Sequence, residues 1–175
     1  MHLFTRVFLT LLFTATLLST RSIAQNKHTS ASADQDVTPI RNEFKRINTL
    51  PLQKEQFTYE VAGCVEEGKV VCYFSNKALV KIAESGSIGD GSWVREFYYR
   101  NGKCIFCYEK LVGGPAEGAA VTTEYRFYIK NDKAVKCMEN STVIPADSKS
   151  TEIITIAQNL LRAYPTKDFG AALCQ

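Results

Sequence analysis

Histidine is almost absent from this sequence. The 175 residues contain two histidines, His2 and His28, and both lie near the N-terminus, ahead of the segments that carry the signals of a folded domain. Ser-His-Asp triads and Cys-His pairs need an imidazole as general base, and many zinc and iron sites need one as a ligand. The scarcity excludes these enzymes and His-based metal sites, and we predict neither a metal nor a cofactor.

A long apolar run is missing too, although a membrane-spanning helix needs about 20 apolar residues. The apolar run from Val7 to Leu18 follows Arg6 and precedes Ser22-Ile23-Ala24. A short apolar segment between a basic start and small residues is typical of a cleaved signal peptide. We therefore predict that residues 1–24 are a signal peptide and that the mature protein is exported, periplasmic or secreted, with no membrane span.

The sequence also lacks a large excess of one charge. It has 21 Lys and Arg against 18 Asp and Glu, and Arg6 and Arg21 belong to the predicted signal peptide. The remaining positive and negative charges nearly balance, and Lys and Arg do not cluster in any one segment. Because neutralised phosphates supply much of the affinity for nucleic acid, we expect no nucleic-acid partner. A mature chain of about 150 residues has the size of one domain with one core.

Cysteine, by contrast, is plentiful. All six cysteines follow the predicted signal peptide: Cys64, Cys72, Cys104, Cys107, Cys137 and Cys174. An even number in an oxidising compartment favours up to three disulfides over metal ligation. A three-residue turn centred on Gly68 would place Cys64 opposite Cys72 at disulfide distance. We therefore predict a Cys64–Cys72 disulfide, with Cys174 joined to Cys104, Cys107 or Cys137.

The segment Cys104-Ile105-Phe106-Cys107 has the spacing of a redox dithiol. Redox dithiols depend on a helix N-terminus, which lowers the pKa of one thiol. Here the surrounding residues predict a strand, in which side chains three positions apart point to opposite faces. We therefore interpret these cysteines as structural, and a cysteine-only zinc site would need a second such pair.

Helical patterns lie at the two ends of the mature chain. Residues 25–36 contain no large apolar side chain, so we predict a flexible leader. Thr38-Pro39 then predicts the start of a short helix that ends before Pro51. Ser150 predicts the N-cap of a longer amphipathic helix that ends before Pro165. Residues 37–175 thus form a single predicted domain.

Between these helices the sequence is typical of β-hairpins. From Phe57 to Glu139, short runs rich in Tyr, Phe, Val and Ile alternate with turn residues. Asn101-Gly102 is a strong signal for a type I′ turn, because both residues tolerate positive φ. Similar runs contain Asn76-Lys77 and Asn131-Asp132 at the same place, which indicates an internal repeat. The fold class predicted is α+β: an antiparallel β-meander of about six to eight strands, with a short N-terminal helix and a C-terminal helix packed on the sheet.

The turns also predict which residues face each other across each hairpin. A two-residue turn at Asn101-Gly102 pairs Arg100 with Lys103, and the ladder continues from there. The expected pairs beyond it are Tyr99–Cys104, Tyr98–Ile105, Tyr73–Val80 and Tyr128–Val135. Three acidic residues recur at one offset in the repeated runs, and we interpret them as solvated strand ends: Glu84, Glu109 and Glu139.

The repeated runs resemble a known group of proteins. The run Phe97-Tyr98-Tyr99-Arg100-Asn101-Gly102-Lys103-Cys104-Ile105-Phe106 and the run from Tyr128 to Lys133 are similar to an uncharacterised group of exported bacterial β-sheet proteins that repeat a Y-[FY]-x-N-G-K-L-I hairpin unit. More remotely, they resemble MORN repeats. The resemblance covers about residues 70–140 and implies no catalytic motif.

Two functions from different classes follow from these patterns. The first is a non-catalytic exported binding or envelope-associated module, with a protein or glycan of the cell envelope as partner. Aromatic side chains with polar tips suit such recognition, and the candidates are Trp93, Tyr98, Tyr99, Tyr108 and Tyr125. The alternative is a carboxylate-based glycan hydrolase, which needs two carboxyl groups about 5–10 Å apart in a cleft.

Overall fold

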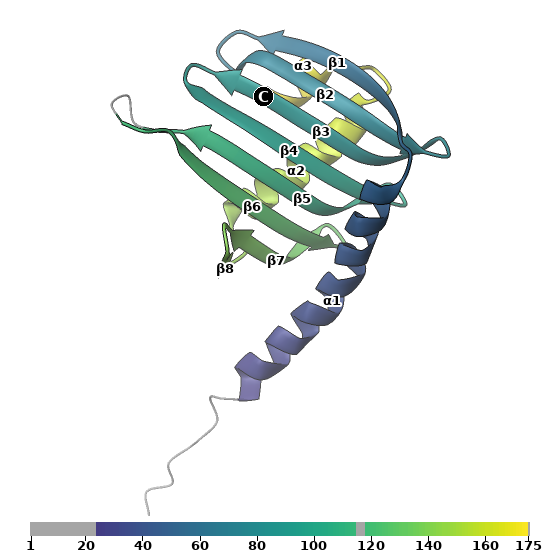
Figure 1. The fold of residues 1–175 in the computed structure, drawn as a ribbon, viewed down its shortest axis with the longest axis vertical. Helices are drawn as coiled ribbons and strands as arrows, with labels where there is room; N and C mark the ends of the chain where they lie inside the picture. The colour runs from purple at the N-terminus through teal and green to yellow at the C-terminus, as the bar shows by residue number, and fades with distance from the viewer. Residues whose placement is uncertain (1–23, 115–117, 175) are drawn as a thin grey trace, which may run out of the picture.

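The chain folds as an eight-stranded antiparallel sheet with helices on both faces, which confirms the predicted α+β class (Figure 1). The computed structural model describes residues 24–114 and 118–174, so the predicted signal peptide, apart from Ala24, lies outside them. The strands follow one another across the sheet in chain order, as in the predicted meander. The helices are α1 (Ala24–Thr49), α2 (Ser148–Ala163) and α3 (Phe169–Leu173), and the strands are β1 (Gln53–Val61), β2 (Val65–Ser75), β3 (Ala78–Ile88), β4 (Gly91–Arg100), β5 (Lys103–Gly113), β6 (Val121–Lys130), β7 (Lys133–Glu139) and β8 (Thr142–Ile144).

Three hairpins turn at the asparagines that the sequence indicates. Asn76-Lys77, Asn101-Gly102 and Asn131-Asp132 all have positive φ at both positions. Positive φ at both central residues defines the type I′ turn, whose twist matches that of the flanking strands. The three turns lie at the same end of the sheet, where they join β2 to β3, β4 to β5 and β6 to β7.

Each of these hairpins contains a β-bulge just after its turn. Tyr99 lies opposite Cys104 as predicted, but Tyr98 lies opposite Phe106, so Ile105 is an extra residue. The predicted Tyr98–Ile105 pair is therefore wrong. The other two hairpins shift in the same way, and the pairs there are Tyr73–Lys81 and Tyr128–Lys136 instead of the predicted Tyr73–Val80 and Tyr128–Val135.

The bulge changes which side chains share a face of the sheet. Ile105 and Phe106 both join the core on the α1 side, while Cys104 and Cys107 both join the core on the α2 side. Two residues of the bulged strand oppose one of its neighbour, so the alternation of faces shifts by one position. The prediction that Cys104 and Cys107 point to opposite faces is wrong for this reason.

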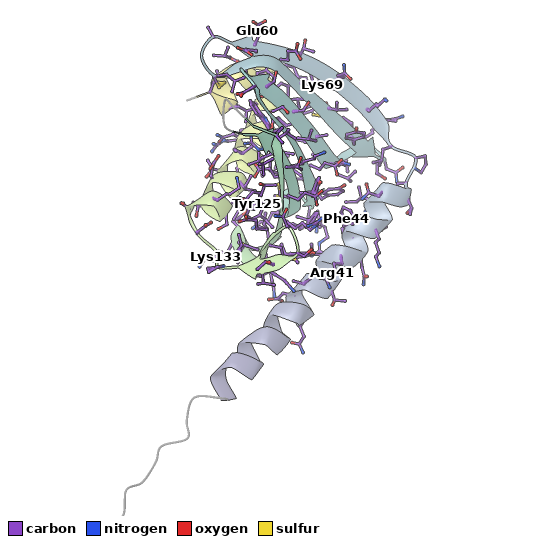
Figure 2. All side chains as sticks on the ribbon, turned by 60° about the vertical axis from the view of Figure 1, so that its left-hand side comes forward. Arg41, Phe44, Glu60, Lys69, Tyr125 and Lys133 are labelled. Carbon is purple, nitrogen blue, oxygen red and sulfur yellow. A yellow bond between two sulfur atoms is a disulfide. The ribbon has the colours of Figure 1, made fainter. Side chains whose placement is uncertain are left out.

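Two separate cores lie on the two faces of the sheet. Figure 2 shows α1 and α2 on opposite sides of it. On the α1 side, Ile40, Phe44 and Ile47 of the helix pack on Tyr98 and Phe106. The larger core on the α2 side contains one row of paired residues that crosses the sheet: Cys72, Ile82, Phe97, Cys107, Phe127 and Cys137.

The ends of the helices differ in part from the predicted ones. Helix α1 begins at Ala24 and contains Pro39, so the predicted start at Thr38-Pro39 is wrong, and the residues of the predicted leader are helical. Its end at Thr49, before Pro51, agrees with the prediction. Helix α2 has Asp147 as N-cap, not Ser150, because the Asp147 carboxylate accepts the backbone N–H of Ser150. Its end at Ala163 also agrees.

The predicted Cys64–Cys72 disulfide is wrong, because Cys64 is bonded to Cys174. Strand β2 runs straight through Gly68, which pairs with Tyr59 of β1. A Cβ on Gly68 would lie 2.6 Å from the Tyr59 ring, so this glycine allows a ring to cross the strand and does not form a turn. The turn lies instead between Val61 and Val65.

The other four cysteines are free and buried, so the predicted additional disulfides are not formed. Cys107 and Cys137 lie in one row with β6 between their strands, and Cys72 lies three strands from Cys107. Neighbouring strands are about 4.8 Å apart, which separates these residues by about 10 to 14 Å. Disulfides need Cα atoms within about 7 Å of each other.

The central turn leads to a prediction about Gly102. No atom lies within 4 Å of a Cβ built there, so only its φ of 72° opposes a side chain. We expect Gly102→Val to lower the free energy of unfolding by about 1–2 kcal/mol, because a β-branched residue resists positive φ. Gly113→Val is the matched control: its surroundings are equally open, its φ is not positive, and its stability in urea should equal that of the wild type. Equal stability of both variants would contradict the turn.

The disulfide leads to a second prediction. It joins residues 110 positions apart, and the chain-entropy model assigns about 4.7 kcal/mol to a loop of about 100 residues. We expect the double variant Cys64→Ser/Cys174→Ser to lose about 3–5 kcal/mol of unfolding free energy in urea. Wild-type protein measured with dithiothreitol should match the variant. Non-reducing peptide mapping that joins Cys64 to Cys72 would show this connectivity to be wrong.

Candidate functional site

A row of charged side chains is buried on the α2 side of the sheet. Glu84, Arg95 and Glu109 lie opposite one another on β3, β4 and β5. Glu84 is 1% exposed and Glu109 is 0% exposed, so the prediction that these acids are solvated strand ends is wrong. Arg95 Nε donates to Glu109 Oε1 at 2.8 Å, and its Nη1 donates to Glu84 Oε2 at 3.3 Å.

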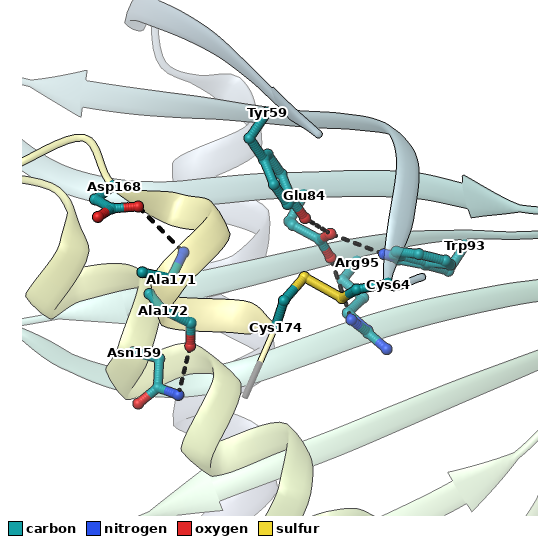
Figure 3. Close-up of a disulfide and its surroundings, with 10 residues drawn as sticks. All are labelled: Tyr59, Cys64, Glu84, Trp93, Arg95, Asn159, Asp168, Ala171, Ala172 and Cys174. Atoms are coloured by element: carbon teal, nitrogen blue, oxygen red, sulfur yellow. Dashed lines mark hydrogen bonds and ion pairs between the residues drawn. A yellow bond between two sulfur atoms is a disulfide. The ribbon is translucent and has the colours of Figure 1, made fainter. Parts of the chain in front are cut away.

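The remaining carboxylate oxygens of this row also have partners. Tyr59 Oη and Trp93 Nε1 each donate to Glu84 Oε1 at 2.8 Å (Figure 3). Lys149 Nζ, at the start of α2, lies 2.6 Å from Glu109 Oε2, but the angles of this ion pair are not those of a hydrogen bond. Two carboxylates therefore face two cations, and the row is close to neutral.

Two strand glycines make this arrangement possible. A Cβ on Gly86 would lie 2.4 Å from Cζ2 of Trp93, just as one on Gly68 would meet the Tyr59 ring. With glycine at both places, the rings of Tyr59 and Trp93 lie close against the strand backbone, and both reach Glu84. A strand glycine often marks such a close approach.

The row is suited to holding the sheet together rather than to acid–base chemistry. Burial disfavours the charge of Arg95, but Glu84 and Glu109 outweigh burial and raise its pKa. Burial and the neighbouring Glu84 carboxylate raise the pKa of Tyr59 far above its usual value, so its hydroxyl stays a donor. Every charge in the row has an opposite charge beside it, which leaves neither carboxylate free for a hydrolytic pair.

The aromatic residues predicted to form a binding surface do not form one row. Tyr98 and Tyr99 are each 1% exposed and face opposite sides of the sheet. Tyr99 Oη donates to the Ala157 carbonyl of α2 at 3.0 Å. Trp93 and Tyr125 are half-buried on the α2 side, with Lys149 4.6 Å above the Tyr125 ring. Tyr108 is half-buried on the α1 side and is the predicted residue that remains available there.

Tyr108 belongs to a part of the α1-side surface that no described helix covers. We call this surface the open face; it comprises Val71, Tyr73, Ala83, Val94, Glu96, Tyr108, Lys110 and Arg126. Helix α1 crosses only the end of this side of the sheet that carries the type I′ turns (Figure 1). A shallow pocket of about 270 Å³ lies at one side of the open face and is lined by Lys69, Val71, Tyr73 and Val94, among others.

Side chains of the open face are held in place by one another and by the adjoining Lys81. The Lys81 ammonium lies 2.7 Å from Glu96 Oε1, and it sits over the rings of Tyr73 and Tyr98 at 5.4 and 4.9 Å. Arg126 lies over the Tyr108 ring at 5.6 Å. Tyr73, Glu96 and Arg126 were not predicted to belong to a binding surface, although their alternation with core residues along the strands is visible in the sequence.

The four free cysteines are poorly suited to redox chemistry. Burial raises the pKa of Cys104 to about 12 and that of Cys72 to about 11. Burial likewise raises the pKa of Cys107 and Cys137. The thiolate is the reactive form, so these thiols are inert while the protein is folded.

The described residues form neither a cluster suited to a metal ion nor a membrane-spanning helix. Within residues 24–114 and 118–174, no three His, Cys, Asp or Glu side chains gather closely enough to hold a metal ion. In the same part of the chain, no helix has the length and apolar character needed to cross a bilayer.

The buried row leads to a prediction for Arg95. We expect Arg95→Met to lower the free energy of unfolding by about 3–5 kcal/mol, because it leaves two buried carboxylates without their shared cation. The matched control is Arg162→Met on the exposed side of α2, which should change stability by less than about 0.5 kcal/mol. Urea denaturation measures both. A loss below about 1 kcal/mol for Arg95→Met would show that the carboxylates do not depend on it.

The comparisons with known proteins give no further guide to this site. No protein-family model, no curated protein and no solved structure matches the chain.

Proposed function

We propose that this protein is an exported binding module without catalytic activity, and that the open face binds a protein of the cell envelope. The observation that carries the proposal is the open face itself. It presents the ring of Tyr73 on β2, the 43% exposed side chain of Val94 on β4 and the ring of Tyr108 on β5. Ion pairs and cation–π contacts hold the charged side chains around them.

The composition of the open face favours a protein partner over a small ligand. Tyrosine and arginine are enriched at protein interfaces, where they often contribute most of the binding energy. Rings held by neighbouring cations lose little conformational entropy on binding. The shallow pocket of about 270 Å³ on this surface is smaller than usual small-molecule sites of about 300–1,000 Å³.

The alternative of a glycan hydrolase has less support. Glu84 and Glu109 are engaged with Arg95, as described above. A pocket of about 560 Å³ beside the β1–β2 hairpin is lined by Glu60, Glu66 and Glu67, but all three are exposed. A catalytic acid at neutral pH needs an environment that disfavours its charge, such as a pocket shielded from water.

The proposal predicts the behaviour of two surface variants in a capture experiment. Immobilised residues 25–175 would be incubated with envelope extract, and captured proteins would be identified by mass spectrometry and measured by titration. We expect Tyr108→Ala and Val94→Asp each to weaken binding of the captured protein about tenfold or more, as loss of an interface anchor does. The control Gln158→Asp, exposed on α2, should bind like the wild type.

Two results would contradict the proposal. One is equal capture by the wild type and both open-face variants, with thermal unfolding showing that all are folded. The other is release of soluble sugar from an envelope glycan by the wild type, which would establish the hydrolase instead. Binding to a glycan array, lost in Tyr108→Ala, would keep the open face as the site but replace the proposed protein partner.

A further inference from the structure

A further pocket, which we call the basic pocket, lies at the end of the sheet that carries the type I′ turns. It has a volume of about 430 Å³ and lies between α1, the β4–β5 turn and the β6–β7 turn. Its lining combines apolar and cationic residues: Ile40, Ile105, Ile129, Arg100, Lys103 and Lys130. A pocket of this size is within the usual range for small ligands.

The pocket already accommodates one carboxylate and retains an excess of positive charge. Asp36 of α1 also lines it, and its Oδ1 lies 2.5 Å from Lys130 Nζ. Lys103 has a looser ion pair with Asp132 at 3.5 Å, in which both side chains are largely exposed. Arg100 is exposed and forms no salt bridge among the described residues. The nearby Glu43 carboxylate is bonded to Arg46, which lowers its pKa, and Arg100 adds to this shift only from a distance. An arginine fork that is not bonded to a carboxylate can bind a carboxylate, phosphate or sulfonate through two hydrogen bonds.

The distribution of charge over the molecule points to the same kind of ligand. The type I′ turns and the residues beside them carry mostly cations: Lys77, Arg100, Lys103, Lys130 and Lys133. Near the turns at the opposite end of the sheet, acidic residues predominate: Glu60, Glu66, Glu67 and Asp90. A field of this direction guides anions to the end of the sheet where the pocket lies.

We propose that this pocket binds a small organic anion: an apolar body that contacts the isoleucines, and one carboxylate, phosphate or sulfonate group that pairs with Arg100. The proposal is independent of the proposed function, because the pocket lies beside α1 and shares no residue with the open face. Both parts of the ligand are needed, since exposed cations alone hold a free inorganic anion weakly in water.

The test uses a fluorescent probe with both parts, 8-anilinonaphthalene-1-sulfonate, and its uncharged analogue N-phenyl-1-naphthylamine. We expect the folded protein to bind the sulfonate at one site, and Arg100→Gln to weaken this binding about tenfold. Binding should also weaken as salt is added, because a charge pair contributes to it. The control Lys45→Gln, exposed on α1 outside the pocket, should leave the sulfonate affinity unchanged.

The site of binding is located by NMR. Amide shifts on adding the sulfonate should cluster at Asn101, Lys103 and Asn131, and Tyr108→Ala should leave them unchanged. The proposal is overturned if Arg100→Gln binds the sulfonate as tightly as the wild type does, or if the shifts cluster on the open face. The proposal is also overturned if Arg100→Gln lowers the affinity for the uncharged analogue as much as it lowers the affinity for the sulfonate, because the loss would then not depend on the charge. None of these results depends on whether the open face binds a partner.

Discussion

The arrangement of this molecule depends on a constraint that three hairpins share: a type I′ turn followed by one extra residue. Each turn has two residues with positive φ, and each bulge displaces the pairing by one position. The displaced strand keeps apolar side chains on both faces, so the sheet needs cover on both. Helix α1 provides it on one side, with α2 and α3 on the other.

The buried row of Glu84, Arg95 and Glu109 depends on this pairing. A slip of one residue between β3 and β4 would turn Arg95 away from the carboxylates and leave their charges without compensation. The start of α2 belongs to the same system, because Lys149 lies against Glu109. The disulfide from Cys64 to Cys174 holds the end of the chain near this row (Figure 3). The row therefore links strand register to the placement of the C-terminal segment.

Both proposed binding sites lie on parts of the sheet that the helices do not fully cover. The open face lies beyond α1, and the basic pocket lies where α1 meets the turns. Both depend on the position of α1, which Phe44 and Ile47 hold against Tyr98 and its neighbours. The cysteines contribute to neither surface as reactive groups, since burial suppresses thiolate formation.

The sequence by itself determined the features that local chemistry controls. Asn101-Gly102 indicated its turn because few residues tolerate positive φ. Pro51 and Pro165 follow the ends of two helices because proline lacks the backbone N–H of a helical hydrogen bond, whereas Pro39 lies inside α1. Tertiary structure decided the rest. The sequence pattern indicated that Gly68 is a turn residue, but in the fold the ring of Tyr59 lies where a side chain at position 68 would be. The sequence pattern indicated that Glu84 and Glu109 are solvated, but in the fold Arg95 and Lys149 lie beside them and they are buried. Cys64 forms its disulfide with a residue 110 positions away. These outcomes depend on neighbours that are distant in the sequence, and no local pattern specifies which distant residues will meet.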